Sequence, residues 1–155
     1  MKRVILFLVL GFCAVVASGE DKKDDPGKGD LKALQGTWVT TKLVINGTTL
    51  VDAKEPPKDG PVSTITYDGH NWVIKFNGEK VAHGTSKLDP TKKPKQIDLT
   101  NDSGPDKGKT LQAIYELNGD EYKVCIAAPG KDRPTEFASK EGSGQRFIVS
   151  KKQKP

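Results

Sequence analysis

The chain has 155 residues, with 25 lysines and arginines against 20 aspartates and glutamates, a net charge of +5. Lys2 and Arg3 lie in an N-terminal segment that we expect to be removed, which leaves 23 basic residues and a net charge of +3. The basic residues form no concentrated face, apart from Lys151, Lys152 and Lys154 at the C-terminus, so composition argues against a nucleic-acid partner. The remaining length suits one domain with one core.

Residues 1–19 have the pattern of a secretory signal peptide. Two basic residues precede an apolar run from Val4 to Val16, and the small residues Ala17–Gly19 follow it. The run is shorter than the ~20 residues that span a bilayer. Cys13 does not indicate a lipid anchor, because the large residue Phe12 precedes it. We therefore expect an extracytoplasmic protein, periplasmic or secreted, that spans no membrane after cleavage.

Residues 20–30 are charged and lack apolar anchors, which predicts a flexible leader. Asp30 is placed to cap one short helical turn over Leu31–Gln35, and Gly36 ends that turn. The rest of the chain shows no sustained helical periodicity, which predicts an all-β domain over residues 31–152, followed by a tail at residues 153–155.

Four Asn-Gly or Asp-Gly pairs separate short alternating runs, as type I′ hairpin turns do: Asn46-Gly47, Asp68-Gly69, Asn77-Gly78 and Asn118-Gly119. The runs predict nine strand segments: 37–45, 48–51, 63–67, 72–76, 80–88, 96–100, 110–117, 121–127 and 145–150. Consecutive hairpins must protect their sheet edges, and closure into an up-and-down barrel of about eight strands achieves this.

The opening of the first strand, Gly36-Thr37-Trp38, resembles the Gly-X-Trp signature of lipocalins. In lipocalins, an arginine from the end of the barrel packs across that tryptophan and closes the base. The resemblance therefore implies a closing contact of Arg146 on Trp38, with Arg133 as a substitute. A guanidinium over an indole ring is a favourable cation–π contact of ~0.5–2 kcal/mol.

Longer motifs extend this resemblance over residues 31–152. They comprise Leu34–Trp38, Leu88–Leu99, Lys107–Leu111, Ile114–Asp120 and Arg133–Phe137, in this order. Together they resemble a family of small uncharacterised bacterial domains, expanded in planctomycetes and described as lipocalin-like. The resemblance implies the barrel fold and an extracytoplasmic location, and it supplies neither catalytic residues nor a ligand.

Catalytic and metal-binding patterns are lacking in the sequence. His70 and His83 are the only histidines, and neither is accompanied by the nucleophile and orienting group that covalent catalysis needs. We therefore predict no enzyme activity, no metal site and no cofactor. Once the signal has gone, Cys125 is the only cysteine. It is expected to be a buried, inert thiol, and a reactive or intermolecular thiol is the alternative.

Three functions stay open, of which a hydrolase is the least supported. The first is binding of a small apolar or amphipathic ligand in the barrel or at its mouth, with Trp72, Phe76, Tyr115 and Tyr122 as candidate lining. The second is a structural or protein-interaction domain whose barrel is filled by its own side chains. A cavity of ~300 Å³ or more would favour the ligand, and a filled interior the interaction domain.

Overall fold

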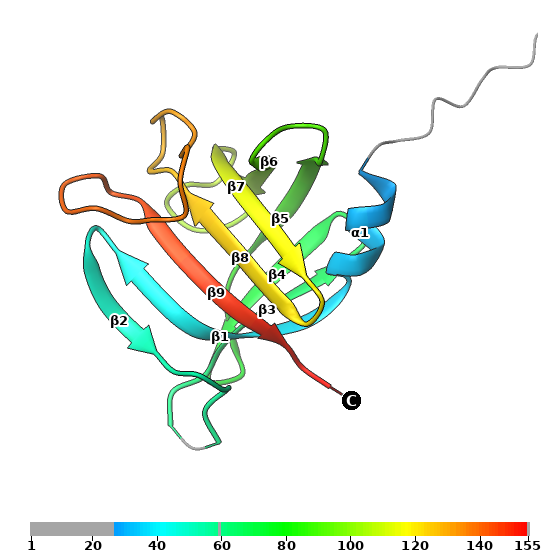
Figure 1. The fold of residues 1–155 in the computed structure, drawn as a ribbon, viewed down its shortest axis with the longest axis vertical. Coiled ribbons are helices and arrows are strands. Elements are labelled where there is room, and N and C mark those ends of the chain that lie inside the picture. Colours follow the sequence, from blue (N-terminus) through cyan, green and yellow to red (C-terminus); the bar gives the residue numbers. More distant parts are fainter. Residues whose placement is uncertain (1–26, 59, 155) are drawn as a thin grey trace, which may run out of the picture.

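The computed structural model describes residues 27–58 and 60–154 (Figure 1). They form one short helix and nine strands: α1 (Lys28–Leu34), β1 (Gly36–Ile45), β2 (Thr48–Asp52), β3 (Ser63–Asp68), β4 (Asn71–Phe76), β5 (Glu79–Asp89), β6 (Lys95–Asn101), β7 (Thr110–Asn118), β8 (Glu121–Ile126) and β9 (Arg146–Lys152). Each predicted strand is present, with ends that differ by at most two residues. Within the described residues, no helix combines the length and apolar character needed to cross a membrane.

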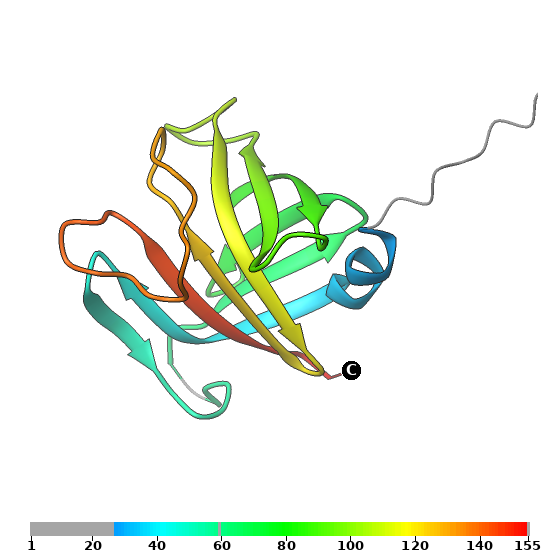
Figure 2. The same ribbon diagram turned by 45° about the horizontal axis from the view of Figure 1, so that its top comes forward.

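The strands close into an antiparallel barrel. From β3 to β9, each strand pairs with the next one along the chain. β1 pairs with β9 over Trp38–Ile45 along one edge, and along its other edge it pairs first with β3 and then with β2. Eight strands therefore form the closed wall, and β2 extends beyond it on the side away from α1 (Figures 1 and 2). The predicted all-β barrel is confirmed.

The hairpin turns are of two kinds. Asn46-Gly47 and Asn77-Gly78 have positive φ at both central residues, as a type I′ turn requires. In the other two turns, the strand pairing includes Asp68 and Asn118, so the two-residue loop begins at the following glycine. Only that glycine has positive φ, as in a type II′ turn. The prediction of four type I′ turns was therefore wrong for these two.

Helix α1 begins at Lys28, inside the segment predicted as a leader; residues 20–26 of that segment and the predicted signal peptide lie outside the described residues. Asp30 is not the cap but a residue of the first turn. Its carboxylate lies 2.7 Å from Lys95 Nζ and accepts a hydrogen bond of 2.7 Å from the Tyr115 hydroxyl. The helix is thereby fastened across one end of the barrel (Figure 2), which we call the base; the opposite end is the mouth.

The base is sealed around Trp38, whose side chain is fully buried. The indole Nε1 donates a hydrogen bond of 2.7 Å to the Leu34 carbonyl oxygen at the end of α1. The cation over its ring is Lys152, with Nζ 5.1 Å from the ring centroid. The predicted contact of Arg146 on Trp38 was wrong, because the register of β1 and β9 sets Lys152 opposite Trp38 and Arg146 opposite Ile45 at the mouth.

The segment between β8 and β9 packs against the outside of the wall. Phe137 contacts Phe147 with ring centroids 6.4 Å apart, and the Cys125 thiol donates to the Ala138 carbonyl oxygen over 3.2 Å. Cys125 is fully buried by this packing, as predicted. Arg133 fastens the same segment, since its guanidinium donates to backbone carbonyls of β6 and β7 and lies 2.6 Å from Asp98. It therefore takes no part in the contact with Trp38.

Candidate ligand-binding cavity

A cavity of about 110 Å³ lies inside the barrel, between the aromatic side chains above the base and the mouth. Its wall is mainly apolar, and all eight barrel strands contribute to it. The lining residues with aliphatic side chains are Ile65, Ile74, Ala82, Leu99, Leu111, Val124, Ile126 and Ile148. Such a surface favours apolar groups over water.

Aromatic side chains form the floor of the cavity. The hydroxyls of Tyr67 and Tyr122 lie 3.0 Å apart, and their rings meet edge to face at 5.9 Å. Tyr122 in turn packs on Trp38 below it, with centroids 5.6 Å apart. Burial raises the pKa of both tyrosines, so both hydroxyls stay neutral. Trp72 completes the floor and donates its indole N–H to the Thr85 carbonyl oxygen over 3.0 Å.

One polar group in the lining is unsatisfied. Ser150 has no exposed surface, and its Oγ has no hydrogen-bond partner within the described part of the chain. The residue lies opposite Thr40 and Tyr122 in the neighbouring strands, which also line the cavity. A buried hydroxyl without a partner costs about 1–3 kcal/mol. A ligand that forms a hydrogen bond with Ser150 would remove this unfavourable free energy.

Arg146 is the only charged residue among the described residues that line the cavity. It begins β9 at the mouth and is partly buried. Residues two apart in a strand share a face, so Arg146 points inward with Ile148 and Ser150. Neither a hydrogen bond nor an ion pair joins its guanidinium to any other described residue.

Two of the four predicted lining residues, Trp72 and Tyr122, line the cavity. Phe76 shares the inward face of β4, but it lies at the end of the β4–β5 hairpin and is 48 % exposed, so it is a rim residue. Tyr115 is buried nearer the base, where its hydroxyl is bound to Asp30. Neither of these two contributes to the lining.

Sequence reasoning missed Tyr67, Ser150 and the inward orientation of Arg146. The only signal was the alternation Arg146-Ile148-Ser150, which is obscured because Phe147 and Val149 on the other face are also apolar. Tyr67 lies at the end of its strand, beside a turn, where alternation is hard to read.

The size of the cavity limits what it can hold. It falls below the ~300 Å³ of typical ligand pockets, because Trp38, Tyr115, Leu88 and other large side chains fill the base half of the barrel. An apolar cavity of ~150 Å³ nevertheless binds benzene. A cavity of about 110 Å³ thus suits a ligand portion no larger than a single ring or a short chain.

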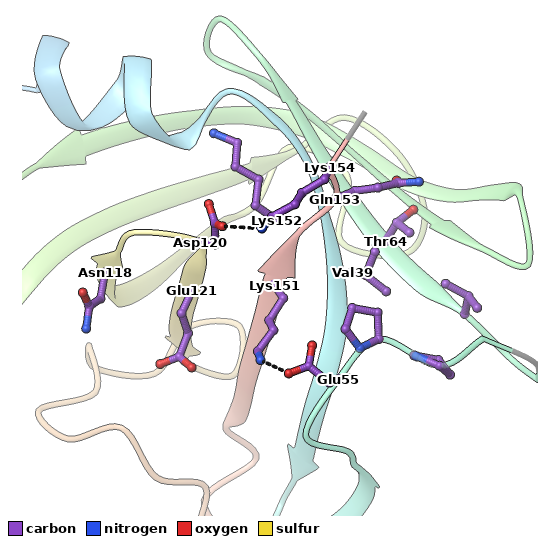
Figure 3. A pocket seen from close by; sticks show the side chains of 13 residues that line it. Val39, Glu55, Thr64, Asn118, Asp120, Glu121, Lys151, Lys152, Gln153 and Lys154 are labelled. Carbon is purple, nitrogen blue, oxygen red and sulfur yellow. Dashed lines mark hydrogen bonds and ion pairs between the residues drawn. The ribbon is translucent and has the colours of Figure 1, made fainter.

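A larger hollow of about 940 Å³ lies on the outer surface and is open to solvent (Figure 3). It lies between the β2–β3 connection, the β7–β8 turn and the C-terminal residues, and four of its six charged side chains form ion pairs within it. Lys151 Nζ is 2.6 Å from Glu55, and Lys154 Nζ is 3.6 Å from Asp120. Because it is wide, open to solvent and mostly lined by paired charges, this hollow is a poorer candidate than the cavity inside the barrel.

The residues considered for catalysis lie elsewhere. His70 is exposed in the β3–β4 turn, with Nδ1 3.1 Å from the Ser86 carbonyl oxygen, and His83 also lies outside the cavity lining. Among the described residues, no three side chains of His, Cys, Asp or Glu come together as metal ligands would.

Comparison of the chain with protein-family models, curated proteins and solved structures finds no match. The likeness to the lipocalin-like family therefore rests on the sequence motifs alone.

Proposed function

We propose that this protein is an exported, non-catalytic binding protein that holds a small, largely apolar molecule in the mouth half of a lipocalin-like barrel. The observation that carries the proposal is the cavity of about 110 Å³ inside the barrel, in which aliphatic and aromatic side chains surround a buried hydroxyl without a partner among the described residues. Export is inferred from the signal-like pattern of residues 1–19, which lie outside the described residues.

The expected affinity follows from the area that a ligand of this size buries. A single aromatic ring buries about 150 Å², which contributes about 4 kcal/mol at ~25 cal/mol per Å² of apolar surface. This free energy corresponds to a Kd of about 1 mM. A neutral ring compound should therefore bind in the range that an NMR titration measures well.

Benzyl alcohol is a suitable neutral probe, and the two tryptophans provide a matched pair of reporters. The Trp72 indole lines the cavity, whereas the Trp38 indole is sealed at the base by its bond to Leu34. We expect titration with benzyl alcohol to shift the Trp72 indole N–H resonance saturably and to leave that of Trp38 nearly unchanged. A Trp72 resonance that does not saturate would contradict the proposal.

A variant that fills the cavity tests the location of binding. Ala82 lines the cavity and packs against the core, so Ala82→Leu should abolish the shift of Trp72. Ala53→Leu adds the same volume at an exposed position and should leave binding unchanged. If no probe binds, the interaction domain becomes the better description. Its candidate surface is the β4–β5 hairpin, where Phe76 and Val81 are 48 % and 56 % exposed.

A further inference from the structure

We infer that the ligand is a small monocarboxylate, whose anionic group pairs with Arg146 at the mouth while its apolar part lies against the cavity wall. This inference rests on the proposed binding function and gives the chemical class of the ligand.

The two arginines among the described residues differ in their surroundings. Arg133 has three partners within the chain, because it donates to the carbonyl oxygens of Ile97 and Ala113 and pairs with Asp98. Arg146, in contrast, has no such partner in the described chain. Arg133 therefore fastens a loop, and Arg146 is left to bind a group from outside the chain.

The neighbours of Arg146 make an external anion the natural partner. Its partners in register are Ile45 and Ile126, and no carboxylate is present among the described lining residues. A guanidinium offers parallel N–H donors that match a carboxylate, and such charge-assisted pairs are about twice as strong as neutral hydrogen bonds. The surrounding apolar side chains reduce the competition from water.

The arrangement along β9 orients the ligand. Arg146 and Ser150 are four residues apart on the same face, a separation of about 13 Å between their Cα atoms at ~3.3 Å per residue. Ile148 lies between them and lines the same cavity. The anionic group therefore belongs at the mouth, and one ring or a short chain extends from it toward the floor. Benzoate has these proportions.

The test compares benzoate with benzyl alcohol, which has the same ring but no charge, through the Trp72 indole resonance. In the unmodified protein we expect benzoate to bind about tenfold more tightly than benzyl alcohol, as one charge-assisted pair allows. Arg146→Gln should remove this advantage, so that benzoate binds no more tightly than benzyl alcohol. Arg146→Lys keeps the charge but loses the paired donors, so benzoate should bind with intermediate affinity.

Lys80→Gln is the matched control, since Lys80 is exposed on the β4–β5 hairpin at the mouth and the substitution removes the same charge. It should change benzoate binding by less than twofold. Equal affinity for benzoate and benzyl alcohol, or equal weakening of benzoate by Arg146→Gln and Lys80→Gln, would overturn the inference and leave the proposed function standing. If neither compound shifts Trp72, the proposed function fails and the inference fails with it.

Discussion

Lys152 holds its ammonium group 5.1 Å from the ring centroid of Trp38, and the same nitrogen donates a hydrogen bond of 3.0 Å to the carbonyl oxygen of Ala33. The side chain of Lys152, in β9, thus contacts both β1 and the end of α1. A cation at the C-terminal end of a helix also interacts favourably with the helix dipole. The base of the barrel is therefore fastened by the residue that ends the closing strand.

Replacing Lys152 by Met should destabilise the protein. The cation–π contact is worth ~0.5–2 kcal/mol, and the hydrogen bond to Ala33 is lost with it, so we expect the free energy of unfolding to fall by about 1–2 kcal/mol. Urea unfolding measures this change. Lys151→Met is the control, because its Nζ pairs with the exposed Glu55 and exposed pairs contribute ~0–1 kcal/mol. Equal losses in both variants would contradict the role of Lys152.

Asp30 should make stability dependent on acid pH. Burial alone would raise the pKa of Asp30, but hydrogen bonds from Lys95 and Tyr115 outweigh it and hold this pKa below the ordinary 3.8. A carboxyl whose pKa is lower in the folded state stabilises the protein above its unfolded pKa. This contribution is lost as the pH falls below 3.8 and through the folded pKa.

The variant Asp30→Asn tests this linkage by urea unfolding at several pH values. At pH 7 we expect it to be about 1–2 kcal/mol less stable than the unmodified protein, as charged hydrogen bonds predict. The difference should shrink as the pH falls through 3.8. Asp52→Asn is the control, since its 3.4 Å pair with Lys42 lies on the exposed surface. A difference for Asp30→Asn that persists unchanged to low pH would contradict the assignment.

The fold could be predicted from local signals, because each hairpin turn and each alternating run acts within about ten residues of the chain. The closing contact at Trp38 could not. Alternation shows which face a residue of β9 occupies, but the residue opposite Trp38 depends on the register between strands more than a hundred residues apart. This register includes a shift between Thr40 and Lys42 of β1. In addition, β9 extends to Lys152, two residues beyond its predicted end, and Lys152 is the residue opposite Trp38.

The cavity was predictable only in part, for a related reason. Trp72 and Tyr122 are large apolar residues in alternating strands, so their inward orientation could be read from the sequence. A polar residue such as Ser150 gives no such signal, and its lack of a partner depends on side chains contributed by distant strands. Phe76 lies on the inward face of β4 as the alternation predicts, but it lies at the end of the barrel wall, so its side chain stays exposed.

Ser150 and Ser86 form a natural comparison, because both are buried in strands and only one is paired. Ser150 Oγ has no partner among the described residues, whereas Ser86 Oγ donates to the His70 carbonyl oxygen over 3.0 Å. We expect Ser150→Ala to raise the free energy of unfolding by about 1 kcal/mol, because the uncompensated hydroxyl is removed. Ser86→Ala should lower it by about 1 kcal/mol. Urea unfolding of both variants decides the matter, and a loss at Ser150 as large as that at Ser86 would show that its hydroxyl is satisfied.

Cys125 should be unreactive in the folded protein. Burial raises the pKa of its thiol, and the segment that contains Ala138 covers it, so little thiolate is present or accessible at neutral pH. We expect iodoacetamide to label Cys125 only as fast as the protein opens, and rapidly in urea. Labelling of the native protein at the rate seen in urea would contradict this prediction and support the reactive thiol. Protein that begins at residue 20 lacks Cys13, so Cys125 is the cysteine that is labelled.

A glycine is required at position 84, where β5 lies opposite Trp72 of β4 and passes close to β6. A Cβ atom at Gly84 would overlap the carbonyl oxygen of Thr100 and lie 2.7 Å from Trp72 Cζ2. Gly84→Ala should therefore displace the Trp72 indole and lower the free energy of unfolding by about 1–3 kcal/mol, as overpacking does.

Gly29→Ala is the control with the opposite expected sign. Nothing lies within 4 Å of its Cβ position in α1, and alanine favours a helix by about 0.5–1 kcal/mol. Urea unfolding should give opposite signs for the two variants, and only Gly84→Ala should shift the Trp72 indole resonance. A Gly84→Ala variant with unchanged stability and an unchanged indole signal would mean that the close approach of β5 and β6 is not as described.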